Sequence, residues 1–254
     1  MNIGIIIQAR LSSQRLPNKV MRPIFRNKSI LDIIIMRLKK MNSNLPIIIA
    51  TGDFEKNKEL FSYASQNDIL FFSGSEDDVL DRFIQCSKQF KLQKLLRVCA
   101  DNPFLDYELA ENIIGVSLSN GYDYVSYSVN NKPAILSHYG FFSEVVSYNA
   151  LLKAHAKSVS DSDKEHVTPY VYNHPEEFLI MLEQAPREII NEEKIRLTVD
   201  TETDFENAAK ILENVVATNG DFSYSFKKVL SVVRDMDDSL QQSMSQQIII
   251  NSKS

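Results

Sequence analysis

Short apolar runs alternate with amphipathic segments along the first half of the chain. The apolar runs contain few polar residues, which is typical of strands buried on both faces of a parallel sheet. Between the runs, apolar residues recur every three or four positions, as on one face of a helix. This alternation, at a spacing of roughly 20 to 25 residues, predicts a Rossmann-like, three-layer α/β/α fold around a mostly parallel mixed sheet. The expected strands cover residues 3–7, 46–50, 69–72 and 94–99, and the expected helices cover 30–41, 54–66, 76–90 and 107–118.

The second half of the chain is less regular. Residues 135–146 are rich in aromatic side chains and show no clear period. We expect a single domain over residues 1–235, with an inserted subdomain at about 122–194. Residues 236–254 are mostly polar and predict a partly disordered tail. The remaining expected elements are strands at 122–127, 178–182 and 196–199, helices at 148–156, 203–218 and 222–233, a helical turn at 166–172 and a polar connection at 158–164.

A cationic stretch follows the first apolar run. Between Gln8 and Lys28 there are six basic residues and no acidic one, although the whole chain has a formal charge of −5. In open parallel sheets, ligands bind at the carboxyl ends of the strands, where this stretch begins. The pattern indicates a site for a compact polyanion such as a nucleoside triphosphate, and the alternative is a solvated surface loop. The six cations are Arg10, Arg15, Lys19, Arg22, Arg26 and Lys28.

Composition narrows the class of protein. The 254 residues, 44% of them hydrophobic, suffice for one large α/β domain. No apolar run approaches the roughly 20 residues that a membrane span needs, and no signal peptide is evident. The two cysteines, Cys86 and Cys99, predict a reducing, cytoplasmic setting without a disulfide framework. The acidic balance disfavours nucleic-acid binding. Because the chain has seven glycines and no glycine-rich phosphate loop, cationic side chains would have to bind phosphates.

Two aspartates lie just after expected strands. Asp101 follows the strand at 94–99, and Asp200 follows the strand at 196–199. We expect both side chains at the carboxyl edge of the sheet, beside the cationic stretch. Two carboxylates beside a triphosphate form a platform for Mg²⁺, which takes one or two carboxylates together with phosphate oxygens and waters. The alternative is that each aspartate only caps the helix that follows it.

Five segments carry a family resemblance. They are Gln8-Ala9-Arg10 with Arg15-Leu16-Pro17-Asn18-Lys19, then Ser73 to Arg82, Ala100-Asp101-Asn102-Pro103, Glu165 to Tyr170, and Val199-Asp200-Thr201 with Asp204. Together they resemble the SpsF-type cytidylyltransferases of spore-coat polysaccharide biosynthesis, which are related to the 3-deoxy-manno-octulosonate and acylneuraminate cytidylyltransferases. The resemblance runs from Met1 to about Leu212 and implies a nucleotide-diphospho-sugar transferase fold.

The resemblance implies a role for each segment. It implies transfer of CMP from CTP to an acidic sugar of the nonulosonate or octulosonate type, with Mg²⁺ as cofactor, release of pyrophosphate and use in surface polysaccharide biosynthesis. His138, His155 and His174 are read as structural. The implied sites are nucleotide-binding (Gln8, Ala9, Arg10, Arg15, Lys19, Ser73, Gly74 and Arg82), catalytic (Arg10, Lys19 and Asp101), metal-binding (Asp101 and Asp200) and acceptor-binding (His166).

The chain departs from the family pattern in three places. Asn18 and Ala100 stand where the family has glycine, and asparagine tolerates the left-handed backbone that glycine allows. Residues 138–143 lack the carboxylates of the family's Gly-Leu-Asp-Val-Glu-like acceptor element, so the acceptor sugar is the least defined part of the interpretation.

The aromatic composition of residues 127–182 also suggests an interface, which predicts a homodimer.

Three rival functions stay open at this point. One is a nucleotidyltransferase that uses another nucleotide, or a sugar-phosphate or polyol-phosphate acceptor. A second is a sugar-nucleotide glycosyltransferase, although neither Asp101 nor Asp200 lies in the Asp-x-Asp motif typical of that class. A third is a catalytically silent nucleotide-binding regulator, which the presence of both phosphate and metal residues disfavours.

Overall fold

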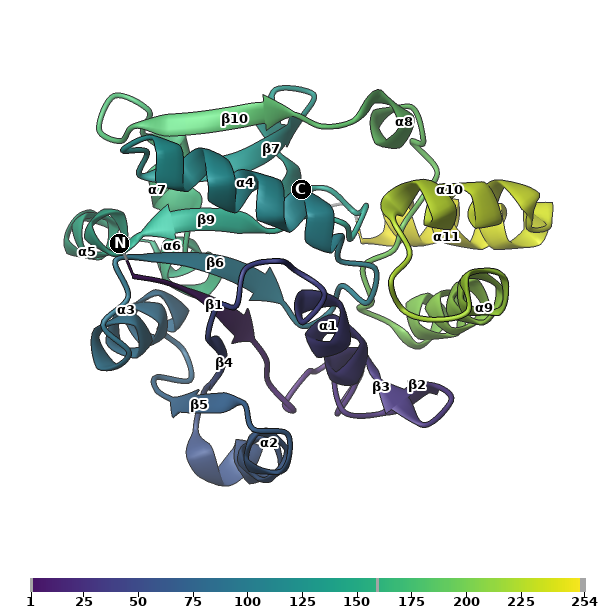
Figure 1. The fold of residues 1–254 in the computed structure, drawn as a ribbon, viewed down its shortest axis with the longest axis horizontal. Helices are drawn as coiled ribbons and strands as arrows, with labels where there is room; N and C mark the ends of the chain where they lie inside the picture. Colours follow the sequence, from purple (N-terminus) through teal and green to yellow (C-terminus); the bar gives the residue numbers. More distant parts are fainter. Residues whose placement is uncertain (1, 159, 252–254) are drawn as a thin grey trace.

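The computed structural model describes residues 2–158 and 160–251. Within these residues an eight-stranded sheet forms the centre of the molecule, in the order β10-β7-β9-β6-β1-β4-β5, with β8 paired to β7 (Figure 1). A separate hairpin joins β2 (Pro23–Phe25) to β3 (Lys28–Ser29). The strands of the main sheet are β1 (Ile3–Gln8), β4 (Ile47–Thr51), β5 (Leu70–Ser73), β6 (Lys94–Cys99), β7 (Tyr124–Val129), β8 (Lys132–Pro133), β9 (Glu144–Ser147) and β10 (Ile180–Gln184).

The sheet is mostly parallel, as predicted. β1 lies between β4 and β6 and is parallel to both, with Gln8 opposite Ala50 on one side and Cys99 on the other. β9 is antiparallel to both β6 and β7, which makes the sheet mixed. Because β1 and β6 run side by side in the same direction, the loops that follow them emerge at one edge. The cationic stretch and Asp101 therefore share this edge.

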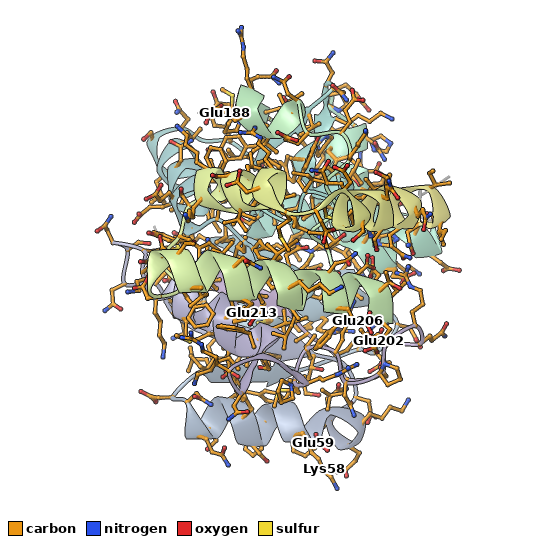
Figure 2. All side chains as sticks on the ribbon, turned by 90° about the vertical axis from the view of Figure 1, so that its right-hand side faces the viewer. Lys58, Glu59, Glu188, Glu202, Glu206 and Glu213 are labelled. Carbon is orange, nitrogen blue, oxygen red and sulfur yellow. The ribbon has the colours of Figure 1, made fainter. Side chains whose placement is uncertain are left out.

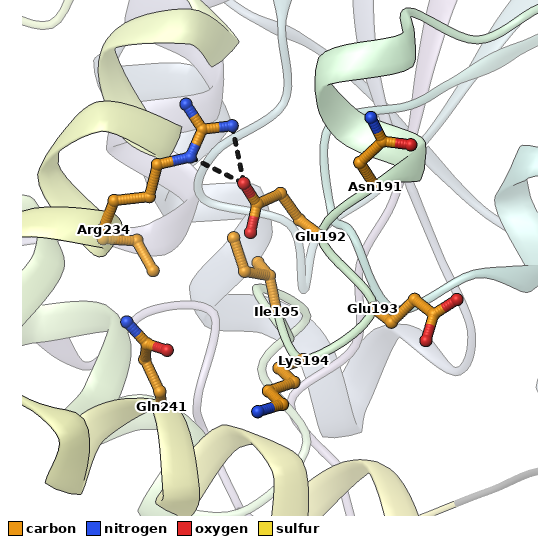
Figure 3. Close-up of a pocket in the computed structure, with 8 residues that line it drawn as sticks. Asn191, Glu192, Glu193, Lys194, Ile195, Arg234 and Gln241 are labelled. Atoms are coloured by element: carbon orange, nitrogen blue, oxygen red, sulfur yellow. Dashed lines mark hydrogen bonds and ion pairs between the residues drawn. The ribbon is translucent and has the colours of Figure 1, made fainter.

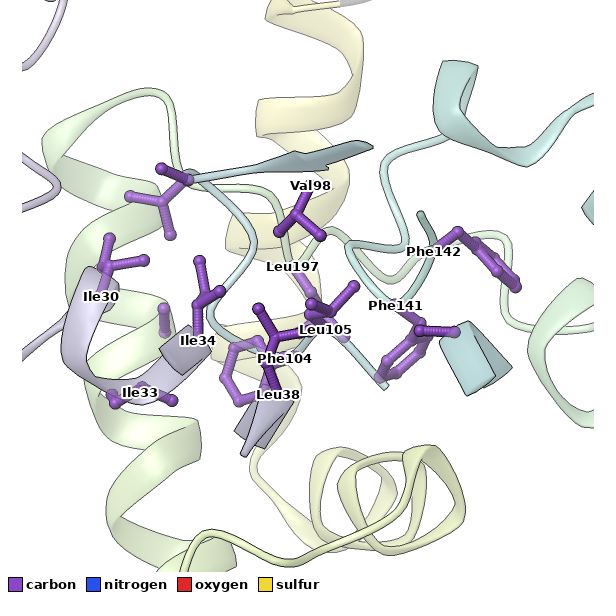
Figure 4. Packing of buried hydrophobic residues seen from close by; sticks show 14 of the residues in the cluster. Ile30, Ile33, Ile34, Leu38, Val98, Phe104, Leu105, Phe141, Phe142 and Leu197 are labelled. Atoms are coloured by element: carbon purple, nitrogen blue, oxygen red, sulfur yellow. The ribbon is translucent and has the colours of Figure 1, made fainter. Parts of the chain in front are cut away.

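Helices cover both faces of the sheet and complete the predicted three layers. The core on one face includes side chains of α1, α2 and α4, and the core on the other face includes side chains of α3, α5 and α7. Figure 4 shows the first of these cores, where Ile30 and Ile34 of α1 approach Val98 of β6. These helices are α1 (Ile30–Leu38), α2 (Phe54–Gln66), α3 (Val79–Gln89), α4 (Tyr107–Ser119), α5 (Tyr148–Lys157), α6 (Asp161–His166) and α7 (Pro169–Asn173).

The remaining helices lie beyond the carboxyl ends of β1 and β6, on the right of Figure 1. The outer face of α9 carries the exposed acidic side chains Glu202, Glu206 and Glu213 (Figure 2). Of the described helices, none combines the length and the apolar character that crossing a membrane requires. The elements of this part are the 3₁₀ turn η1 (Ala134–Leu136), α8 (Arg187–Ile190), α9 (Glu202–Asn219), α10 (Phe226–Asp235) and α11 (Asp238–Ile250).

Four expectations about local structure were wrong. Residues 195–200 form no strand, because their backbone bonds go to irregular segments: Leu197 N donates to His138 O (2.8 Å) and Val199 N donates to Asp101 O (2.9 Å). The aromatic stretch 135–146 contains β9, and α6 occupies most of the expected polar connection, whose residue 159 lies outside the described residues. The described part of the polar tail is not disordered. Its helix α11 buries Leu240 and Met244 in the core, while residues 252–254 lie outside the described part.

Candidate nucleotide site

The cationic stretch folds into an ordered loop that buries Lys19 and leaves its other five cations exposed. Asn18 adopts a left-handed backbone with φ of +56°, the conformation for which asparagine in place of glycine was expected to be suitable. Its N–H donates to Leu11 O (3.0 Å), and its carbonyl accepts from the N–H groups of Met21 and Arg22. This turn sets the direction of the next side chain, that of Lys19.

Lys19 joins the two predicted metal-binding aspartates. Its side chain is only 11% exposed, and its Nζ donates to Val199 O (2.6 Å). The same Nζ lies 3.3 Å from Asp200 Oδ1 and 3.9 Å from Asp101 Oδ2. The structure thus brings together four predicted site residues from three distant segments, which we call the phosphate cluster: Arg15, Lys19, Asp101 and Asp200.

Asp200 is surrounded by cations. Its Oδ1 lies 2.9 Å from Arg15 Nη2, and its Oδ2 lies 2.8 Å from Arg196 Nη2. Burial acts to raise the pKa of Asp200, but Lys19, Arg15 and Arg196 outweigh burial and hold the pKa below its usual value. Asp200 is therefore ionised at neutral pH, which a metal-binding or phosphate-organising carboxylate needs.

Sequence reasoning missed Arg196. Its fully buried guanidinium forms two hydrogen bonds to Asp204 and one to Asp200, and it donates through Nη1 to His138 Nδ1 (2.6 Å). Asp204 also accepts from the backbone N–H groups of Asp200 and Thr201 in a capping box at the start of α9. Arg196 thereby fixes the orientation of Asp200. A signal was present, since an arginine between the apolar residues Ile195 and Leu197 needs a buried partner.

Arg10, which was predicted to hold the triphosphate, and Arg82, which was predicted for the base pocket, lie in different environments. Arg10 is exposed and makes no hydrogen bond or ion pair within the described part of the chain. Arg82 is buried, and its Nε and Nη2 donate to the carbonyls of Ser75 and Glu76 (both 2.8 Å). Gly74 packs so closely on Arg82 and Phe72 that a Cβ would lie 2.8 to 3.0 Å from them. Arg82 therefore fixes the 73–76 loop through these hydrogen bonds, while Arg10 is accessible to a ligand.

The histidines differ as well. His166, the predicted acceptor residue, is exposed at the end of α6. His138 accepts from Arg196, and His155 lies 3.3 Å from Asp78. His174 stacks on Tyr170 with ring centroids 4.0 Å apart. These contacts agree with a structural role for His138, His155 and His174.

The two aspartates of the phosphate cluster fit the needs of a hard cation. Within the described residues, no group of three or more carboxylate, histidine or cysteine side chains could hold a metal by itself. Mg²⁺ requires no such group, because it is commonly held by one or two carboxylates with phosphate oxygens and waters. Asp101 is a third exposed and contacts the cluster only through the 3.9 Å approach of Lys19, so its oxygens are accessible.

The C-terminal helix reaches this site, which the sequence did not suggest. Asn251, just after α11, accepts from Arg15 Nη1 (2.6 Å). Gln247 accepts from the hydroxyl of Thr201 (3.1 Å), the residue after Asp200. Both contacts come from a segment whose polar composition predicted disorder.

A cavity of about 210 Å³ lies elsewhere, between the 191–195 segment, α10 and α11. Its lining includes Glu192 and Arg234, which pair with one another (Figure 3). Gln241 lines this cavity near the start of α11, whereas Asn251 lies just after the end of that helix. At a rise of 1.5 Å per residue, the two residues are about 15 Å apart along the helix. The cavity is therefore separate from the phosphate cluster.

A mixed, mostly parallel sheet with cations and carboxylates at the end of its central strands is the arrangement expected of a nucleotidyltransferase, and the comparison with known families shows that the chain is one. The model of the Cytidylyltransferase family matches residues 4–236, and the chain belongs to this family. It is 38% identical over 205 residues to an uncharacterized protein of Methanocaldococcus jannaschii, with 81% of each chain covered. It is 36% identical over 213 residues to the spore coat polysaccharide biosynthesis protein SpsF of Bacillus subtilis, covering 81% of this chain and 84% of SpsF.

Solved structures confirm the fold. A cytidylyltransferase from Leptospira borgpetersenii superposes with a TM-score of 0.83 at 24% identity, covering 95% of this chain and 97% of that one. A CMP:2-keto-3-deoxy-manno-octonic acid synthetase complexed with CTP gives a TM-score of 0.64 at 12% identity, covering 84% and 99%. The predicted nucleotide-diphospho-sugar transferase fold is thus confirmed.

Proposed function

We propose that this cytidylyltransferase transfers CMP from CTP to an oxygen of an acidic sugar, of the nonulosonate or octulosonate type, and releases pyrophosphate. The observation that carries the proposal is the placement of Lys19 between Asp101 and Asp200 at the carboxyl ends of β1 and β6. In this reaction the oxygen of an acceptor hydroxyl forms a bond to the α-phosphorus of CTP, the bond from that phosphorus to the bridging oxygen of pyrophosphate breaks, and the hydroxyl proton passes to solvent.

The cations of the first loop stabilise the charge that develops on the leaving pyrophosphate. Arg10 is exposed and unpaired within the described residues, so it can bind phosphate without losing a protein partner. Arg15 is 55% exposed, so its side chain can turn from Asp200 toward a phosphate. Lys19 is buried and fixed, and it presents its charge from one position.

Mg²⁺ would be held by Asp101 and Asp200. When bound, it would neutralise phosphate charge and align the attacking and leaving oxygens. Lys19 would keep the two carboxylates close together, and Arg196 would fix Asp200.

We expect Asp101→Asn to abolish the Mg²⁺ dependence of CTP binding and leave folding unchanged, because Asp101 has few protein partners. Calorimetric titration of CTP with and without Mg²⁺ measures this, and the exposed Asp68→Asn is the control. Unchanged Mg²⁺ dependence in Asp101→Asn would remove Asp101 from the metal site.

The names of two similar proteins support the proposed acceptor class. SpsF is named for spore coat polysaccharide biosynthesis, and the synthetase that shares the fold acts on an octonic acid. We infer a related acidic sugar, used for a surface polysaccharide in a reducing cytoplasm. Within the described residues no disulfide involves Cys86 or Cys99, which agrees with that setting, and burial raises the pKa of Cys86 to about 12.

Nucleotide selection provides the first test. We expect CTP with Mg²⁺ to raise the melting temperature more than ATP, GTP or UTP does, and pyrophosphate release to require CTP together with an acidic sugar. Equal thermal shifts for the four nucleotides would reject the base assignment. Turnover with the phosphates of neutral sugars, but not with acidic sugars, would reject the acceptor class.

A homodimer through residues 127–182 is also part of the proposal. β10 is an edge strand of the sheet, and Leu179 beside it is 55% exposed. An exposed edge with apolar side chains is suited to pairing with another chain. Light scattering that gave the 29.0 kDa mass of one chain at micromolar concentration would exclude the dimer.

A further inference from the structure

A second polar cluster lies inside the molecule, on the face of the sheet covered by α3, α5 and α7. Its centre is an ion pair of 2.6 Å between Arg97 Nη1 and Glu144 Oε1, whose side chains are 7% and 0% exposed. Glu144 also accepts from the hydroxyls of Thr168 (2.9 Å) and Tyr124. Arg97 donates through Nε (3.2 Å) and Nη2 (2.9 Å) to Gln8 Oε1. We call this group the buried cluster: Gln8, Arg97, Tyr124, Glu144 and Thr168.

The buried cluster fixes the direction of the Gln8 side-chain amide. A guanidinium group only donates hydrogen bonds, so the amide oxygen must face Arg97 and the amide nitrogen must face away. That nitrogen forms no hydrogen bond within the described residues. Gln8 is the last residue of β1, and its backbone carbonyl accepts from Ala100 N (3.1 Å), next to Asp101. The Gln8 amide donor is therefore held at the edge of the sheet where the phosphate cluster lies.

A strained turn supports the same arrangement. Val167 is fully buried and has φ of +74° and ψ of −52°, a conformation that is rare for a β-branched residue. The turn is closed by a hydrogen bond from Thr168 N to His166 O (2.9 Å). It directs the hydroxyl of Thr168 onto Glu144. Strain of this kind persists where surrounding contacts determine the conformation, and it is concentrated at functional sites.

We propose that Gln8 donates a hydrogen bond to a neutral oxygen of the bound nucleotide, and that Arg97, Glu144 and Thr168 are positioning residues for this contact. Because Glu144 balances the charge of Arg97, the buried cluster offers a neutral donor rather than a site for an anion. The oxygen it suits is a base carbonyl or a ribose hydroxyl. The proposal rests on the proposed use of CTP, but it does not depend on the acceptor sugar.

Two substitutions of Gln8 test the contact by calorimetric binding of CTP with Mg²⁺. Gln8→Glu keeps the oxygens that face Arg97 and replaces the donor by an acceptor, while Gln8→Met keeps the length and removes the polar atoms. We expect each to raise the Kd for CTP about tenfold, the effect of one lost hydrogen bond of about 1.4 kcal/mol. The ratio for Gln8→Glu should persist at high salt, where simple charge repulsion is screened. Wild-type affinity in both variants would overturn the proposal.

Comparison of CTP with 2′-deoxy-CTP identifies the oxygen. If Gln8 contacts the ribose 2′-hydroxyl, Gln8→Met should weaken CTP and leave 2′-deoxy-CTP as in the wild type. If Gln8 contacts the base, both nucleotides should weaken equally. A variant that binds CTP normally but has a higher KM for the sugar would overturn the nucleotide assignment. Because the binding measurements with CTP and 2′-deoxy-CTP contain no acceptor, they stand even if transfer to an acidic sugar is wrong.

Thr168 tests the positioning role. Thr168→Val keeps the shape and removes the hydroxyl bound to Glu144, and we expect the Kd for CTP to rise about threefold to fivefold. Thr168→Ser should restore the affinity, and Thr218→Val on the exposed end of α9 should have no effect. In the Gln8→Met background, Thr168→Val should cause no further loss, because its effect passes through Gln8. Effects that simply multiply, or a Thr168→Ser variant as weak as Thr168→Val, would overturn the positioning role.

Discussion

The phosphate cluster and the buried cluster both lie near the carboxyl ends of β1 and β6, but they differ in how exposed their charged side chains are. Arg15 and Asp101 of the phosphate cluster are 55% and 33% exposed, so water or a ligand can replace their protein partners. Glu144 and Arg97 of the buried cluster are almost inaccessible to water, so each charge depends on its protein partners. Exposed pairs contribute little to folding and can be exchanged, whereas a buried charge that loses its partner is costly. The first cluster is suited to chemistry and the second to orientation.

The largest difference between the clusters should appear in stability. We expect Glu144→Ala to lower the free energy of unfolding by about 3–5 kcal/mol, because it leaves Arg97 buried without its counter-charge. Urea denaturation measures this effect. Glu177→Ala is the matched control, since Glu177 pairs with the partly exposed Lys153 and Lys157 and its loss should lower the free energy of unfolding far less. Similar losses in both variants would show that burial does not distinguish the clusters.

Lys19 tests the chemical role of the phosphate cluster. Lys19→Ala should lower kcat/KM by roughly 10²-fold or more, as loss of a charge stabiliser of the transition state does. Because Lys19 is mostly buried and donates to Val199 O, the variant should also lose about 1–2 kcal/mol of stability. Pyrophosphate release and urea denaturation give the two numbers, and the exposed Lys58→Ala, outside the cationic stretch, should change neither. Near-normal turnover in Lys19→Ala would return this lysine to a purely structural role.

The phosphate cluster could be predicted from the sequence for a physical reason. Arg15 and Lys19 lie in the loop after β1 and Asp101 lies just after β6, and strands that run in parallel bring their carboxyl ends to one edge. Asp200 was expected at the same edge, but the segment before it is not a strand. Lys19 and Asp101 were therefore expected near each other, although they are far apart in the chain. The left-handed backbone of Asn18 was expected as well. The burial of Lys19 and the contacts of Arg196 with Asp200 and Asp204 were not expected, because both depend on how residues 195–200 pack.

The buried cluster could not be assembled from the sequence, because pairing between strands decides it. Arg97 and Glu144 are opposite one another only because β9 returns antiparallel to β6, from a stretch that showed no clear period. Residues 138–143, where the family has its acceptor carboxylates, end one residue before Glu144. One signal was available: an arginine inside the apolar run 94–99 requires a buried partner. It does not tell which carboxylate that partner is.

The smallest expected effect concerns α11, which lies outside the family match at residues 4–236 and yet contacts the phosphate cluster. Asn251 accepts from Arg15, whose side chain is more than half exposed, so the bond is easily replaced by water. Leu240 and Met244 hold α11 independently of this contact. We therefore expect Asn251→Ala to change the free energy of unfolding by about 0.5 kcal/mol or less.

The same variant shows whether the end of α11 belongs to the phosphate cluster. Because Asn251→Ala frees one donor of Arg15, the affinity for CTP with Mg²⁺ should stay the same or increase by a few fold in calorimetric titration. Ser243→Ala, which removes the bond that α11 accepts from Asn207 instead, is the matched control and should leave the affinity unchanged. A tenfold loss in Asn251→Ala alone would mean that Asn251 holds Arg15 in its binding position. The phosphate cluster would then include a residue from outside the family match, and its exposed contacts could no longer be treated as exchangeable.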